Sequence, residues 1–255
     1  MHPSPVEWNQ FYESFKRKTG LDLGLYKPQQ MQRRILSMAT AKGAKSLGEF
    51  WNMVQTERDG LAWFQDKLAI NVSELFRNAD KFQELETKIL PELLSRSPKL
   101  KIWSAGCSYG AEAHSVACIL AKKFPGAHQV IGSDIDQAAL AQAKAGHFND
   151  ADMRGVPNEY RSFFVKERNQ WLATPPIKKY LTFRTGNLLA DRFDSGFDLI
   201  LCRNVVIYFT DEAKADLYAK FFQALKPGGI LFVGSTERIF GAEQLGYAQA
   251  RPFFY

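Results

Sequence analysis

Two hydrophobic patterns divide the chain, and one gives way to the other near residue 70. Before that point apolar residues recur at helical spacing, and no run alternates as a strand does. Helices are predicted at four places, over 11–20, 29–43, 46–55 and 57–70. Gly20 and Gly43 stand at predicted helix ends, and Ser46 with Glu49 has the spacing of a capping box. Residues 1–70 are therefore predicted to form an all-helical N-terminal domain.

From residue 99 onward the pattern alternates between strands and helices. Strand-like apolar runs occupy 99–106, 128–135, 197–205 and 230–235, with helical runs at 111–124, 136–146 and 211–225. Strands separated by crossover helices indicate a parallel sheet, so residues 99–255 are expected to be an α/β domain. Residues 71–98, with a helix over 79–94, connect the two domains.

One stretch interrupts this alternation, from about residue 147 to about residue 183. It combines prolines, aromatic residues and short extended runs, without a helix of crossover length. We expect it to be an inserted antiparallel or irregular subdomain.

Composition excludes several classes of protein. Of the 255 residues 45% are hydrophobic and 24% charged, so disordered and fibrous classes fit poorly. No apolar run approaches the roughly 20 residues of a membrane span. Cys107, Cys118 and Cys202 are odd in number and lack CxxC spacing, so neither a disulfide framework nor a metal site is expected. The absence of a signal peptide pattern adds to the expectation of a cytoplasmic protein.

The clearest chemical signal is the run KIWSAGCSYGAEAHSVA, a strand followed by a glycine-containing turn and a helix. Gly106 and Gly110 allow a tight turn and close approach of a ligand. Asp134 ends the next strand, where a carboxylate can accept hydrogen bonds from a ribose diol. The run is not a GxGxxG, and this favours S-adenosylmethionine over NAD. Packing glycines without a ligand remain the alternative.

Polar residues also follow the later strands. Asn187 could pair with an adenine edge, and Arg203 and Asn204 follow the apolar strand 198–202. Turn chemistry explains both asparagines equally well, because asparagine commonly closes strands.

Several segments together resemble one known family in order along nearly the whole chain. They are INVSELFR, WSAGCSYGAE, GSDID, GNLLAD, CRNVVIYF, LKPGGILFVGSTE and the terminal FFY. They resemble the CheR family, the chemotaxis receptor glutamate methyltransferases. The resemblance implies an all-helical N-terminal domain and a Rossmann-like domain that binds S-adenosylmethionine and carries a small antiparallel β-subdomain. It also implies methylation of glutamate side chains on the cytoplasmic region of chemoreceptors.

The resemblance also implies roles for the residues of this sequence that match the motifs of the family. The cofactor-binding positions it implies are Asn71, Ser73, Arg77, Glu112, Asp134, Asn187, Leu188, Arg203 and Asn204. Arg77 and Tyr208 would lie beside the transferred methyl group and act in catalysis. Arg33, Arg34, Lys42 and Lys45, on or near one N-terminal helix, would recognise the acidic receptor helices. No metal is expected, and a monomer is the default.

Methyl transfer to a carboxylate agrees with what the sequence lacks. A glutamate is already ionised at neutral pH, so no general base is needed, and the four histidines show no ligand or acid–base spacing. Tyr109, Ala111, Ala113 and His114 depart from the usual family run in the first loop. Two alternatives therefore stay open: a methyltransferase for a different carboxylate or other acceptor, and a degenerate sensor or docking domain.

Overall fold

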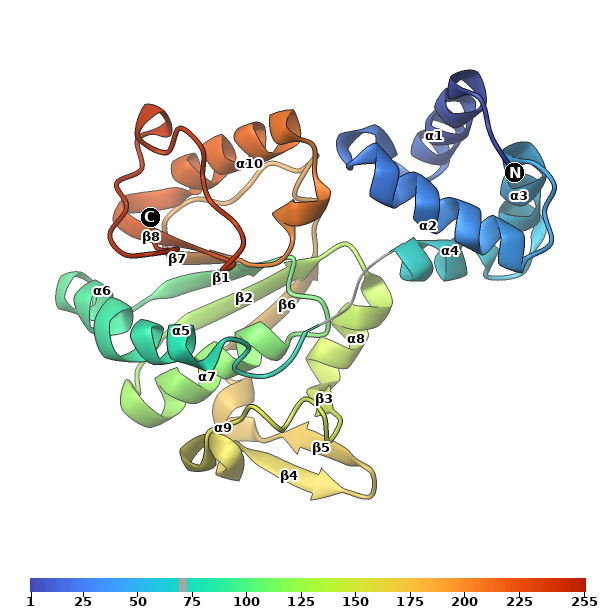
Figure 1. Cartoon of the computed structure of the whole chain (residues 1–255). Helices are drawn as coiled ribbons and strands as arrows, with labels where there is room; N and C mark the ends of the chain where they lie inside the picture. Colours follow the sequence, from blue (N-terminus) through green and yellow to red (C-terminus); the bar gives the residue numbers. More distant parts are fainter. Residues whose placement is uncertain (69–72) are drawn as a thin grey trace. The chain divides into compact units, whose positions relative to one another are not determined.

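The computed structural model describes residues 1–68 and 73–255 and divides into two compact units (Figure 1). The first unit comprises Met1–Ile70 with Ile207–Ala215, and the second comprises Asn71–Val206 with Asp216–Tyr255. The division after residue 70 lies where the hydrophobic pattern changes. The segment 207–215, by contrast, groups with helices from which it is far removed in sequence.

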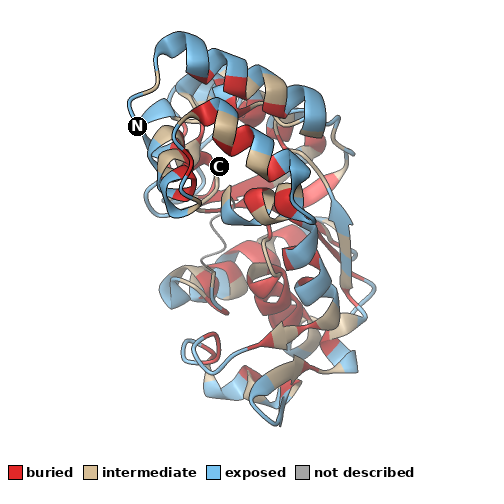
Figure 2. Ribbon diagram, turned by 90° about the vertical axis from the view of Figure 1, so that its right-hand side faces the viewer, coloured by how far each residue is buried: buried red, intermediate tan, exposed pale blue. Residues whose placement is uncertain are grey.

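The first unit is helical throughout its described N-terminal part, as the spacing of apolar residues predicts. Its elements are α1 (Pro5–Thr19), η1 (Leu23–Leu25), α2 (Pro28–Ala41), α3 (Leu47–Thr56) and α4 (Gly60–Leu68). Each helix buries one side and exposes the other (Figure 2). The rings of Phe11, Phe50 and Phe64 lie within 6.2 Å of one another and form the centre of the core.

The ends of these helices show which capping signals are used. Gly20 adopts the left-handed conformation expected of a C-cap. Helix α1 begins earlier than the hydrophobic pattern predicts, because Ser4 and Glu7 form a reciprocal capping box. At α3 only half of the expected box forms: Ser46 accepts the Glu49 N–H, while the Glu49 carboxylate accepts the Lys45 N–H.

The second unit is built on a five-stranded parallel sheet in the order β6-β2-β1-β7-β8. The strands are β1 (Lys101–Ala105), β2 (Gln129–Asp134), β6 (Leu181–Thr185), β7 (Phe197–Cys202) and β8 (Leu225–Val233). At the β8 edge the terminal residues run antiparallel, and Leu231 and Tyr255 exchange backbone hydrogen bonds. This order confirms the α/β expectation and brings the carboxyl ends of all five strands to one edge.

Helices cover both faces of this sheet (Figure 1). They are α5 (Ala79–Glu84), η2 (Leu85–Ile89), α6 (Leu90–Arg96), α7 (Ala111–Lys123), α8 (Gln137–Ala145) and α10 (Asp211–Ala224). The predicted helix over 79–94 is interrupted by the π-turn η2, just before Pro91. Proline has no N–H to donate to the preceding turn, which accounts for the irregular ladder there.

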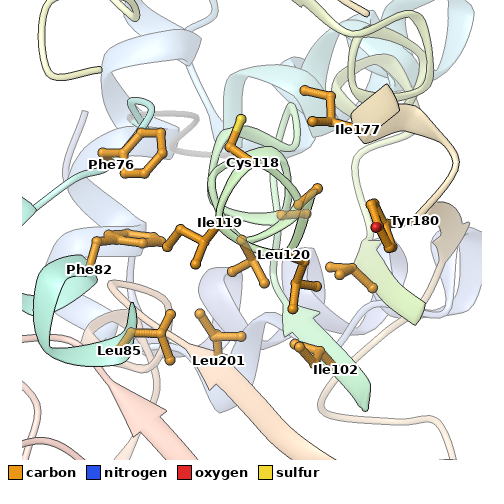
Figure 3. Close-up of a cluster of buried hydrophobic side chains, with 14 of the residues drawn as sticks. Phe76, Phe82, Leu85, Ile102, Cys118, Ile119, Leu120, Ile177, Tyr180 and Leu201 are labelled. Carbon is orange, nitrogen blue, oxygen red and sulfur yellow. The ribbon is translucent and has the colours of Figure 1, made fainter. Parts of the chain in front are cut away.

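The core of this unit surrounds α7, which is buried along most of its length. Ile119 and Leu120 of α7 face Ile102 and Leu201 of the sheet, and Phe82 packs at one side (Figure 3). A helix buried this completely fixes its first turn against the sheet, so the loop that precedes it is also fixed.

The inserted subdomain is a small antiparallel sheet, β3-β5-β4. Its strands are β3 (His147–Phe148), β4 (Phe164–Glu167) and β5 (Gln170–Ala173), flanked by η3 (Asn158–Phe163) and α9 (Pro175–Lys178). The expected boundary near residue 183 was too late, because Leu181–Thr185 pairs with β2 in the main sheet. Among residues 1–68 and 73–255, no helix is both long and apolar enough to span a bilayer.

His114 of α7 makes the stability of this unit pH-dependent. Burial lowers its pKa from the ordinary 6.5 to about 4, although its ring nitrogen Nδ1 lies 2.8 Å from the Gly110 carbonyl. The unfolded chain takes up this proton near pH 6.5 and the folded chain only near pH 4. Stability present above pH 6.5 is therefore lost as the pH falls, by up to about 3 kcal/mol. Urea unfolding of the native chain and of His114→Phe at pH 7.5 and pH 5 measures this, and an equal acid loss in both would contradict it.

Candidate functional site

The loop between β1 and α7 lies at the carboxyl edge of the sheet and has an unusual backbone. Gly106, Ser108 and Gly110 all have positive φ, at 74°, 49° and 83°. A Cβ at Gly106 would lie 2.6 Å from Val205 Cγ2, so only glycine fits both the conformation and the space. The Gly106 and Cys107 N–H groups donate to the Ser133 carbonyl at 2.9 Å, which joins this loop to β2.

Asp134 ends β2 beside this loop. Its Oδ2 accepts the Ser108 N–H at 2.7 Å, and its Oδ1 accepts the Asp136 N–H at 3.0 Å. Burial raises the pKa of the Asp134 carboxyl, while these backbone donors act in the opposite direction. The Ile135 N–H is a third backbone donor to this carboxylate. A carboxylate has about four lone-pair positions, so three donors leave capacity for a hydroxyl of a ribose. Asp136 caps α8 as its position after the strand indicates.

A crevice of about 320 Å³ opens beside the ends of β2 and β6. It is lined by Trp103, Ser133, Arg184, Thr185, Gly186, Asn187, Leu188, Asp191, Arg192 and Phe193. Asn187 Oδ1 accepts the Leu189 N–H at 3.0 Å, and the Asn187 N–H donates to Asp191 at 2.7 Å. The Asn187 oxygen therefore shapes the turn, whereas Leu188 supplies apolar surface. Its lining combines the aromatic residues Trp103 and Phe193 with several polar residues, which suits a flat heterocycle.

Glu112, in the first turn of α7, connects this loop to β7. Its Oε1 accepts the Ser104 hydroxyl at 2.7 Å, and its Oε2 lies 3.3 Å from Arg203. The Arg203 guanidinium also donates to the Arg77 carbonyl at 3.0 Å and to Asn78 Oδ1 at 2.8 Å. Through these two hydrogen bonds Arg203 holds Arg77 and Asn78, the residues directly before α5.

The Arg203 side chain is buried inside the second unit. Its guanidinium carbon lies 5.4 Å from the Phe82 ring and 4.6 Å from the Phe232 ring, and its side chain is 3% exposed. Burial lowers the Arg203 pKa, with the Glu112 charge opposing this and the Arg77 charge adding to it. The geometry gives Arg203 a supporting role for Arg77.

The segment 73–78 that carries Arg77 is fixed at several points. The Ser73 carbonyl accepts a hydrogen bond from Tyr109, and the Phe76 N–H donates to Ser115 Oγ at 2.8 Å. Phe76 has a φ of 56°, costly for a bulky residue, and its ring stacks on Tyr160. Strain held by so many contacts is typical of a segment that presents a functional side chain. Asn71, expected at the start of this region, lies outside the described residues.

Tyr109 is the bulkiest of the residues that depart from the usual family run, and its hydroxyl has hydrogen-bond partners outside the loop. Its hydroxyl approaches Asp152 Oδ1 at 2.9 Å as well as the Ser73 carbonyl. Burial raises the Tyr109 pKa, and Asp152 adds to this, so the phenol is a hydrogen-bond donor at neutral pH. The ring is therefore directed toward Ser73 and the start of the small sheet.

Replacing Tyr109 by Phe is expected to destabilise the protein by about 1–3 kcal/mol, because buried Asp152 loses a donor. Urea unfolding measures this loss. Tyr109→Phe/Asp152→Asn should recover part of it, since an amide can donate as well as accept. An unchanged midpoint in the single variant would contradict the role given to the hydroxyl.

Asn204 follows β7 and turns the chain with a φ of 59°. Its N–H and that of Val205 donate to the carboxylate of Glu237, at 2.9 and 3.1 Å. Glu237 is a buried residue that the sequence analysis missed. Its one signal was an acidic residue close after an apolar strand, and this pattern is also common on surfaces.

Tyr208 belongs to the first unit, unlike Arg77. It ends the short helix η4 (Val206–Tyr208), and its carbonyl accepts the Lys27 N–H at 2.8 Å. Next to it, Phe209 packs edge-on against Tyr26 at 5.2 Å. The helical unit therefore holds the backbone of the Tyr208 turn.

The four basic residues proposed for substrate recognition differ in environment. Lys42 pairs with Glu57 and lies 4.5 Å from the Trp63 ring centre. Arg34 donates to the Lys67 carbonyl at 2.6 Å. Arg33 and Lys45 are exposed. Two of the four thus have partners inside the unit.

Metal-ligand clusters and reactive thiols can be searched for among residues 1–68 and 73–255. Outside residues 69–72, no three His, Cys, Asp or Glu side chains gather as metal ligands would. Burial raises the pKa of Cys107, and the Asp134 and Glu112 charges add to this. Its thiol is therefore protonated at neutral pH and is a poor nucleophile.

Comparison with known proteins agrees with this architecture. The family model "CheR methyltransferase, SAM binding domain" matches residues 71–251, and "CheR methyltransferase, all-alpha domain" matches residues 7–68. A chemotaxis protein methyltransferase of Listeria monocytogenes is 39% identical over 96% of this chain and 95% of its own length. Chemotaxis protein methyltransferase 1 of Pseudomonas aeruginosa is 34% identical over 90% of this chain and 89% of its own.

Solved structures also include similar chains. A TehB-like SAM-dependent methyltransferase from Corynebacterium glutamicum has a TM-score of 0.39 and 18% identity, over 70% of this chain and 93% of that one. The two family models together cover nearly all of the sequence. The resemblance seen in the sequence motifs is thereby confirmed: the chain belongs to the CheR family of S-adenosylmethionine-dependent methyltransferases.

Proposed function

We propose that this protein transfers the methyl group of S-adenosylmethionine to glutamate side chains in the cytoplasmic region of chemoreceptors. The product would be a glutamyl methyl ester. The names of the relatives from Listeria and Pseudomonas support chemotaxis as the setting. The observation that carries the proposal is Asp134, a largely buried carboxylate held at a strand end beside a positive-φ loop. A cytoplasmic monomer is the form we propose.

The side chains present fit the cofactor. Asp134 keeps acceptor capacity for a ribose hydroxyl, and the crevice at Asn187 and Leu188 suits an adenine ring. Glu112 follows the loop and accepts from Ser104, and the Ser73 carbonyl accepts from Tyr109 of the loop. We assign both residues to the cofactor site. We assign Asn71, Arg203 and Asn204 to the same site, with Arg203 acting through Arg77 and Glu112.

Bound S-adenosylmethionine supplies an electrophilic methyl group on a positively charged sulfur. The glutamate that receives it is already ionised near pH 7, so the protein need not remove a proton. What the protein contributes is alignment and exclusion of water, and alignment alone can be worth about 7–11 kcal/mol. Arg77 is proposed to orient one carboxylate oxygen, and Tyr208 to shape the pocket around the methyl group.

Receptor recognition is assigned to the helical unit. Of its four candidate residues, Arg33 and Lys45 are exposed and therefore available to an acidic helix. Lys42 and Arg34 have partners within the unit, so their contribution would require those contacts to exchange.

A labelled methyl-transfer assay on membranes that contain chemoreceptors tests the proposal. Label released as methanol by mild base supports a glutamyl ester. Base-stable label would instead indicate a different acceptor. No label from protein that binds S-adenosylhomocysteine would indicate a sensor or docking domain.

A further inference from the structure

Glu237 holds two loops of the second unit together through one side chain. Its Oε2 accepts the Gly234 N–H at 2.7 Å and the Asn204 N–H at 2.9 Å, while Oε1 accepts the Val205 N–H at 3.1 Å. The residue is 3% exposed. Gly234 follows β8 and Asn204 follows β7, so this carboxylate bridges the carboxyl ends of neighbouring strands.

This arrangement requires a carboxylate and not merely a polar side chain. Three backbone donors converge on two oxygens, which an ionised carboxylate can satisfy. An amide of the same shape has one oxygen and would face at least one N–H with its own NH₂ group. Arg203 provides a nearby positive charge that helps to offset burial of the anion.

The loop fixed in this way is the one that presents Asn204. A φ of 59° is a conformation that asparagine tolerates but that needs support from its surroundings. The adjacent N–H groups of Asn204 and Val205 both donate to the Glu237 carboxylate, and these two hydrogen bonds provide that support. They fix the direction in which the Asn204 side chain leaves the backbone.

We propose that Glu237 is a positioning residue for the cofactor: it orients Asn204 at the carboxyl edge of the sheet and so sets the affinity for S-adenosylmethionine. The inference rests on the proposed assignment of Asn204 to the cofactor site. Glu237 itself does not need to touch the ligand. Its effect passes through the turn after β7.

Binding of S-adenosylhomocysteine to Glu237→Gln, measured by calorimetry well below the melting temperature, tests the inference. We expect binding about tenfold or more weaker, because hydrogen bonds to a buried charge are lost. The matched control is Glu243→Gln, an exposed acid six residues farther along, which should bind as the native chain does.

A second variant keeps the charge and moves it. A Cβ at Gly234 would lie 2.4 Å from Glu237 Oε2 and 3.0 Å from the Asn204 nitrogen, so Gly234→Ala displaces the carboxylate without removing it. Gly234→Ala should weaken binding in the same direction as Glu237→Gln. This variant keeps the inference testable if Glu237→Gln does not fold.

The double variant Glu237→Gln/Asn204→Ala separates positioning from general support. If Glu237 acts through Asn204, the double variant binds within roughly twofold of Asn204→Ala alone. An equal loss with and without the Asn204 side chain would overturn the inference, as would native affinity in both Glu237→Gln and Gly234→Ala. Because the readout is cofactor binding, an error about the receptor substrate would appear only in the methyl-transfer assay.

Discussion

Replacing Arg77 by Ala is expected to lower the rate of methyl transfer at saturating substrates by about a hundredfold, the cost of a misplaced reacting group. Arg77 lies on a segment whose backbone is held by Arg203, Ser115 and Tyr109 before substrate arrives. Without the Arg77 guanidinium, the incoming carboxylate loses the donor that aligns one of its oxygens. Initial rates on receptor-containing membranes measure the effect, and calorimetry with S-adenosylhomocysteine shows how much of it is cofactor binding.

Two further variants make the result specific. Arg77→Lys keeps the charge but loses the planar fork, so it should recover only part of the rate. Arg58→Ala removes an arginine whose side chain is 97% exposed and should leave the rate unchanged. A rate for Arg77→Ala within threefold of native, or a fall matched by Arg58→Ala, would remove Arg77 from the mechanism.

Local sequence signals were sufficient for the parts of the site that each depend on one loop. Gly106 and Gly110 indicated a turn of special geometry, and both have positive φ. Asp134 was predicted at a strand end, and the structure has it there. In each case the signal and the structure it specifies lie within a few residues of each other.

The remaining parts depend on contacts between distant segments. Arg203 meets the carbonyl of Arg77 although 126 positions separate the two residues in the sequence, and only the folded chain brings them together. Glu237 looks like a surface acid until β8 is placed beside β7 and its carboxylate meets the N–H of Asn204. The order of the strands in the sheet cannot be predicted from residue type and spacing alone.

The charge exposed at the surface also depends on contacts between segments that are distant in the sequence. Lys42 looked like part of a basic face because it follows Arg33 and Arg34 in the chain. In the folded unit it lies against Trp63 and Glu57, which come from the next two helical segments. A charge count along a helix therefore overestimates the charge available to a partner.

Replacing Arg203 by Met is expected to reduce stability by about 3–5 kcal/mol, because the partly buried Glu112 carboxylate loses its counter-charge. The Glu112 side chain is 12% exposed and keeps only the Ser104 hydroxyl as a direct donor among the hydrogen bonds described for it. Removal of the guanidinium also releases the Arg77 carbonyl and Asn78. Urea unfolding measures the stability, and cofactor binding should weaken with it.

The double variant Glu112→Gln/Arg203→Met distinguishes a buried charge from lost packing. Methionine can fill much of the space between the Phe82 and Phe232 rings, and the neutral amide no longer needs a counter-charge. The double variant should therefore be more stable than Arg203→Met alone, although two residues have changed instead of one. If the losses of stability in Glu112→Gln and in Arg203→Met add up to the loss in the double variant, the two residues are not coupled. Arg203 would then support the segment that carries Arg77 through packing and its backbone contacts alone.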